Sequence, residues 1–143
     1  MNKIFKAECY KTVVPLKRPF STSRFTSTKS TNYIIRLECE GVVGVGEAAA
    51  RGYKLTGDHK KTLPSVIEQM LEITRESYID LSSKDKALES IRLILSKLEK
   101  CAADNASEIN KKKPFRGILS GFDIALLDLA ARGLNITVLG RRN

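Results

Sequence analysis

A polar stretch near the N-terminus combines cations and aromatic rings in a pattern that could bind a ligand. The stretch is LKRPFSTSRFTSTKSTN, residues 16–32, in which Arg18, Phe20, Arg24 and Phe25 interrupt a run of serines and threonines. Interleaved cations and rings can hold nucleic acid by phosphate contact and base stacking. They can equally close over a small anion, or form a surface loop with Phe20 tucked into the core. Serine and threonine dominate the stretch and cannot build a core, so we predict a loop here. Loops of this length in compact domains are usually functional or disordered.

A second candidate segment is RGYKLTGDH, residues 51–59. Arg51 and Tyr53 supply a guanidinium and a phenol that could serve a ligand. Thr56 or Asp58 could instead begin the next helix as its N-cap residue, because hydroxyl and carboxylate oxygens accept hydrogen bonds from helix amides. For Asp58 we favour this capping role.

Two acidic residues in the last predicted helix resemble a catalytic carboxylate pair, but their spacing is wrong for one. Asp123 and Asp128 are five residues apart, which places them roughly 140° apart around a helix. We therefore interpret both as structural.

Other common site motifs are missing from the sequence. The run GVVGVGEAA has neither the lysine of a phosphate-binding loop nor the spacing of a dinucleotide site. No serine stands in a nucleophile elbow. Cys9, Cys39 and Cys101 lie far apart with no CxxC pair and a single histidine, His59, so we expect no zinc site and interpret them as reduced thiols of a cytosolic protein.

Three strands and several helices are predicted to position these segments. Residues 4–14 form a first strand that ends at Pro15, and residues 33–39 alternate with a period of two. A turn at Glu40-Gly41 leads to a return strand over 42–48. Glycines inside that strand, Gly44 and Gly46, predict a bulge or the close approach of another backbone.

Apolar residues at helical spacing predict helices in the second half of the chain. Leucine, isoleucine and valine recur at helical intervals over 63–77 and again over 88–98, and Ser82 with Asp85 resembles a capping box before the second stripe. A short third helix over 102–110 has a weak signal. A last helix should run from Pro114 to Gly133.

Several separated motifs together resemble one known family. They are PLKRPFSTS (15–23), GVVGVGEAA (41–49), LTGD (55–58) and SGFDIALLDLAARGLNITVLG (120–140). In this order they resemble the N-terminal capping domain of the enolase superfamily, of the mandelate racemase/muconate lactonizing enzyme type and most similar to its dipeptide epimerases. The resemblance implies an α+β fold: a three-stranded antiparallel β-meander followed by a three- to four-helix bundle.

The same resemblance implies a domain layout. Residues 1–134 would form the capping domain, and residues 135–143 a truncated linker toward a missing (β/α)₈ barrel. A chain of 143 residues is too short to hold such a barrel, which needs roughly 200–250 residues.

The family's chemistry would lie in that barrel. Its members, isomerases and lyases such as epimerases and cycloisomerases, abstract a proton α to a carboxylate, and Mg²⁺ stabilises the enediolate. The resemblance assigns no catalytic or metal residue here, so we expect an inert chain and Mg²⁺ only in a full-length enzyme.

The resemblance does assign residues to two substrate-specificity loops. The first loop would hold Arg18, Phe20, Ser23, Arg24 and Phe25, and the second Arg51, Tyr53, Leu55 and Thr56. Arg24 is the best candidate to contact a small carboxylate substrate, because a guanidinium pairs bidentately with a carboxylate. A solvated arginine is the alternative.

Charge and apolar residues leave two further classes of function open. The net charge is +9, but basic residues are spread along the chain and the one tight cluster, Lys111–Lys113, is interpreted as a solvated loop. A nucleic-acid-binding domain would show affinity that falls steeply with salt.

A stand-alone protein-interaction module would need a polar surface where the barrel docks. Apolar residues remain there instead, so we predict that the chain associates with itself through them: Ile124, Leu127, Ile136, Val138 and Leu139. No apolar run reaches the roughly 18–20 residues of a membrane span. The first residues, MNKIFKAECYK, show no apolar core of a signal peptide, so we expect that the protein is not exported. We expect a cytoplasmic protein.

Overall fold

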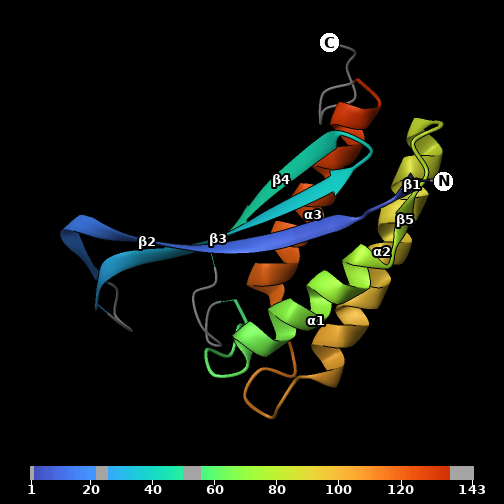
Figure 1. Cartoon of the computed structure of the whole chain (residues 1–143). Helices are drawn as coiled ribbons and strands as arrows, with labels where there is room; N and C mark the ends of the chain where they lie inside the picture. Colours follow the sequence, from blue (N-terminus) through green and yellow to red (C-terminus); the bar gives the residue numbers. More distant parts are fainter. Residues whose placement is uncertain (1, 22–25, 50–55, 136–143) are drawn as a thin grey trace.

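The protein folds into a sheet layer backed by helices (Figure 1). The computed structural model describes residues 2–21, 26–49 and 56–135, and for residues 14, 16–21 and 26–30 it describes the backbone alone. In chain order the elements are β1 (Asn2–Lys3), β2 (Lys6–Ser21), β3 (Thr26–Cys39), β4 (Val42–Ala48), α1 (Leu63–Arg75), β5 (Tyr78–Ile79), α2 (Lys84–Asp104) and α3 (Arg116–Gly133). The predicted α+β fold, a three-stranded antiparallel meander followed by helices, is confirmed.

The main sheet has the strand order β2-β3-β4, with antiparallel neighbours. The alternation predicted for 33–39 is confirmed, since Ile35, Leu37 and Cys39 are fully buried. Glu40 and Gly41 both adopt positive φ, 46° and 80°, in the turn to β4. Positive φ at both central residues matches the right-handed twist of the strands it joins. β1 and β5 form a separate small antiparallel sheet that the sequence did not predict.

Strands β2 and β3 are longer than predicted. Residues 16–32, which we expected to form a loop, instead supply the far ends of both strands, and the pairing shifts register between Pro15 and Phe20. The two strands extend beyond the helices as a ribbon (Figure 1). Because no helix covers this part, the strands need no alternating apolar face, and threonine favours the extended backbone. The loop prediction was therefore wrong for the described part of this stretch.

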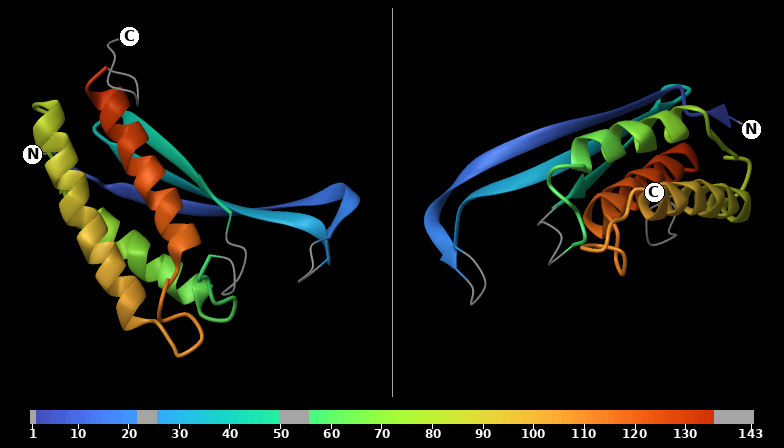
Figure 2. Two further views of the ribbon diagram at one scale, coloured as in Figure 1. Left: turned by 180° about the vertical axis from the view of Figure 1, so that it is seen from behind. Right: turned by 90° about the horizontal axis from the view of Figure 1, so that it is seen from below.

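The helices lie on one side of the sheet, with α3 against β3 and β4, α1 against β2, and α2 packed on α1 and α3 (Figure 2). The predicted helix over 102–110 is wrong: α2 continues to Asp104 and ends where the Asn105 amide donates to the carbonyl of Cys101. The predicted cap was one residue off. Ser83, not Ser82, caps α2 by accepting from the Lys86 amide at 3.2 Å, because Ser82 instead donates to Asp80.

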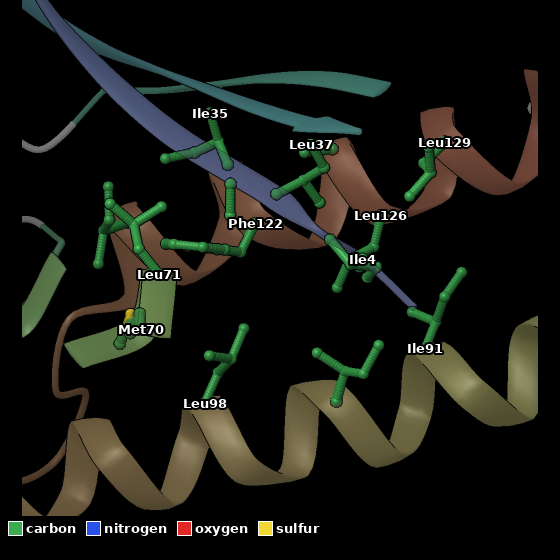
Figure 3. Close-up of a cluster of buried hydrophobic side chains, with 14 of the residues drawn as sticks. Ile4, Ile35, Leu37, Met70, Leu71, Ile91, Leu98, Phe122, Leu126 and Leu129 are labelled. Carbon is green, nitrogen blue, oxygen red and sulfur yellow. The ribbon is translucent and has the colours of Figure 1, made fainter. Parts of the chain in front are cut away.

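One hydrophobic core joins the sheet to all three helices. Figure 3 shows side chains from each layer pointing toward one another. The core residues it labels are Ile4, Ile35, Leu37, Met70, Leu71, Ile91, Leu98, Phe122, Leu126 and Leu129, all buried. Burying such side chains is the main source of the domain's stability.

The glycines of β4 allow α3 to approach the sheet closely. A Cβ atom added at Gly44 would lie 2.5 Å from both the carbonyl oxygen of Ala125 and the amide nitrogen of Leu129. At Gly46 it would collide with the carbonyl oxygen of Gly121. The close backbone approach predicted from these glycines is confirmed, and α3 is seated on β4 with little freedom to shift.

Candidate functional site

The first predicted specificity segment includes the far end of β2, and the second follows β4. Arg18 and Phe20 lie on the far end of β2, where the structure gives the backbone alone. The remaining predicted residues except Thr56 lie outside the described residues: Ser23, Arg24, Phe25, Arg51, Tyr53 and Leu55. The assignment of these residues to two specificity loops therefore stays a prediction.

Thr56 shows how the second segment is attached to the domain. Its backbone carbonyl accepts from the Gly117 amide at 3.1 Å, and its hydroxyl donates to the Asp58 carboxylate. Gly117 stands in the first turn of α3. The end of the second segment is thus fixed to α3.

Asp58 caps a helix, but not the one that follows it in sequence. Its carboxylate is almost completely buried, at 1 % exposure, and accepts from the Ile118 amide of α3 at 3.1 Å. Thr62 occupies the N-cap position of α1 and makes no side-chain capping bond. The prediction that Asp58 begins the next helix was wrong, because the tertiary fold brings α3 to it across sixty residues of sequence.

The neighbouring backbone strengthens this attachment. The Gly57 carbonyl accepts from the Phe115 amide at 2.8 Å and from the Asn110 side-chain amide at 2.9 Å. Gly57 has φ +75°, and Phe115, which is fully buried, has φ 54°. A bulky residue at positive φ is held there only when its surroundings fix it. Residues 56–58 and the start of α3 are therefore joined by a network of hydrogen bonds.

Burial governs the protonation of Asp58. Removal from water raises the pKa of its carboxyl, while hydrogen bonds from the Thr56 hydroxyl and from the Ile118 and Gly117 amides act in the opposite direction. The net direction is upward, since desolvation disfavours the charged form more than the bonds favour it. No basic side chain is among the causes of this shift.

The two acids of α3 do not act together, as predicted. Asp128 accepts from the Val45 amide at 2.9 Å and from Arg132 Nε at 3.1 Å, so it ties α3 to β4. Asp123 instead borders a surface hollow of about 440 Å³ between α2 and α3, and burial raises its pKa. Its lining includes Lys112, Lys113 and Arg116, but none of the specificity-loop residues whose side chains the structure describes.

Within the described ranges, no three histidine, cysteine, aspartate or glutamate side chains gather closely enough to hold a metal ion. Among the helices the structure describes, none is both long and apolar enough to cross a membrane.

Comparison with protein families identifies the domain. The family model described as "Mandelate racemase / muconate lactonizing enzyme, N-terminal domain" matches residues 5–140. The chain belongs to this family. The resemblance predicted from the sequence motifs is thereby confirmed, and no curated protein matches the chain in sequence.

Solved structures show the same domain within longer chains. A dipeptide epimerase from Cytophaga hutchinsonii, complexed with Mg and the dipeptide D-Ala-L-Val, is 25 % identical with a TM-score of 0.64; the match covers 90 % of this chain and 30 % of that one. A mandelate racemase/muconate lactonizing enzyme-like protein from Rubrobacter xylanophilus is 18 % identical with a TM-score of 0.67, covering 95 % and 32 %. At that lower identity the likeness shows the fold alone. The chain thus spans about a third of the length of these relatives.

Sequence reasoning missed the residues that join the second segment to α3. Asn110, Phe115 and Gly117 make this contact, and none belongs to a recognisable motif. One signal was present, since Thr56-Gly57-Asp58 combines a hydroxyl, a glycine and a carboxylate. Its partner could not be found from the sequence, because the contact is long-range.

Proposed function

We propose that this chain is the capping and substrate-specificity domain of a dipeptide epimerase or a muconate cycloisomerase-like enzyme. The observation that carries the proposal is the family match over residues 5–140, combined with coverage of about 30 % of relatives such as the dipeptide epimerase. The catalysed reaction would be proton abstraction α to a carboxylate.

The role of the domain in this proposal is to close the active site. The first loop would act through Arg18, Phe20, Ser23, Arg24 and Phe25, and the second through Arg51, Tyr53, Leu55 and Thr56. Closure excludes water, which strengthens electrostatic interactions around the developing enediolate. Arg24 would pair with a carboxylate of the substrate.

Catalysis itself would depend on a barrel domain. Residues 1–134 would form the capping domain, and residues 135–143 would lead toward the barrel. One relative was solved with Mg, and we propose that Mg²⁺ serves the full-length enzyme from ligands in its barrel. The described residues of this chain offer no cluster of ligands for it.

A turnover assay tests this division of labour. The pure 143-residue chain, with Mg²⁺ and a panel of dipeptides, should show no epimerisation by NMR exchange of the α-proton in D₂O. Turnover by the chain alone would contradict the proposal that catalysis lies elsewhere.

Part of the predicted self-association surface lies within the described residues. Ile124 is 47 % exposed, whereas Leu127 is half-buried and packs against the core. Ile136, Val138 and Leu139 lie outside the described residues. Homo-oligomerisation therefore stays a prediction, which sedimentation velocity of the chain at rising concentration would test.

A further inference from the structure

Residues 48–58 contain most of the second specificity segment, and we call them the connection. The described residues at both ends of the connection lie against the same face of α3. At the β4 end, a Cβ atom added at Gly121 would lie 2.7 Å from the Cβ atom of Ala48. At the other end, Gly117 donates to the Thr56 carbonyl and lies directly against the Asp58 carboxylate. Gly117 and Gly121 are four residues apart, which places them one above the other on a helix.

Both ends of the connection are therefore attached to one helix, α3. α3 is in turn held on β4 by the close backbone approach at Gly44 and Gly46. A shift of the first turns of α3 would therefore displace both ends of the connection together. From the connection, the side chain of Asp58 reaches the N-terminus of α3, where its carboxylate accepts from the Ile118 amide.

We propose that Asp58 is a positioning residue that fixes the second specificity segment on the first turn of α3. This inference rests on the proposed function for its biological meaning, since the segment is the one that would select the substrate. Asp58 would not touch the substrate and would act through Thr56, with which it shares a hydrogen bond, and through Ile118.

The size and chemistry of the side chain fit this role. A Cβ atom at Gly117 would lie 3.1 Å from the Asp58 Cγ atom, so the carboxyl fits tightly against a residue without a side chain. One carboxylate oxygen accepts from Ile118 and the other from Thr56. Asparagine keeps one of these acceptors and is an equally good capping residue, whereas alanine keeps neither.

Limited trypsin digestion of the 143-residue chain tests the proposal. The measured quantity is the rate of cleavage after Arg51 and Lys54, divided by the rate after Lys97 in α2, which reports global unfolding. For Asp58→Ala we expect this ratio to rise about 5- to 30-fold, the effect of losing one helix cap on a local opening equilibrium. Asp58→Asn should restore most of the wild-type ratio.

Asp128→Ala is the matched control. It also removes a carboxylate that bonds α3 to the backbone of the β4 region, but at the Val45 amide rather than at the connection. It should leave the ratio unchanged even where urea denaturation shows an equal loss of global stability. If Asp58→Ala does not fold, Asp58→Ser, which keeps a single acceptor, takes its place and should raise the ratio by a smaller factor.

An unchanged ratio in the Asp58 variants would overturn the inference, and so would an equal rise in Asp128→Ala. Digestion needs neither substrate nor barrel. A chain that proves to have no part in epimerisation would therefore refute the proposed function while leaving this result standing.

Discussion

Adding one methyl group at Gly46 should destabilise the domain strongly, because the group would meet backbone rather than side chain. In Gly46→Ala the new Cβ would collide with the carbonyl oxygen of Gly121 and lie 2.6 Å from the amide nitrogen of Ala125. Carbon contacts need about 3.5 Å, so α3 would have to move by about 1 Å. The helix cannot yield by a rotamer change, since both colliding atoms belong to its backbone.

The expected cost follows from packing energetics. Overpacking a dense interior typically costs about 1–3 kcal/mol, and a backbone collision belongs at the upper end. Replacing glycine also restricts the unfolded chain, which offsets about 0.4–1 kcal/mol. We therefore expect a net loss of about 2 kcal/mol. At a urea slope of about 2 kcal/mol/M, the unfolding midpoint should fall by about 1 M.

Gly133→Ala is the matched control for this experiment. Its Cβ would meet the terminal Cδ1 atom of Leu81 at 2.7 Å, and a leucine methyl group can rotate away. This variant should lose less than about 1 kcal/mol. The reasoning would be refuted if urea denaturation, followed by circular dichroism, gave the two variants equal midpoints.

Three further predictions follow from buried polar groups. Burial raises the pKa of Asp58 above its ordinary 3.8 in the native state, so the native state binds the carboxyl proton more tightly than the unfolded state does. The stability that this proton binding contributes should be lost as pH rises from about 4 through the native pKa. Urea midpoints of Asp58→Asn should lack this fall with pH, and a pH profile identical to that of the wild type would contradict the prediction. Asn110→Ala should cost about 1–3 kcal/mol in urea denaturation, because it removes the buried donor to Gly57; a loss below about 0.5 kcal/mol would count against the contact. Burial raises the pKa of the Cys9 thiol to about 11 and also raises the pKa of Cys39 and Cys101. All three should therefore react slowly with a thiol reagent at pH 8 until the chain is unfolded; rapid labelling of the native protein would disprove this.

Local patterns predicted the covered part of the sheet and the helices. The alternation over 33–39 and the helical stripes depend on burial against a neighbouring layer, which the sequence records directly. The paired glycines Gly44 and Gly46 also predicted a close backbone approach, although they could not identify α3 as the partner. Gly133 ends the last helix as predicted.

The predictions failed where structure does not depend on an apolar pattern. The ribbon formed by the ends of β2 and β3 is not covered by a helix, so its residues show no alternation and resembled a loop. Asp58 was assigned to the nearest helix in sequence, whereas its partner Ile118 is distant in sequence and close only in the fold. Capping chemistry predicted that Asp58 would bind helix amides but could not specify which helix.

The central claim is that this domain works by capping a barrel, and the most direct test is to purify the native gene product from its source cells and measure its intact mass. The account predicts a product that carries roughly 200–250 additional residues, the size of a (β/α)₈ barrel, or a 143-residue product that copurifies with a separate barrel chain. A 143-residue product that purifies with no barrel chain would contradict it.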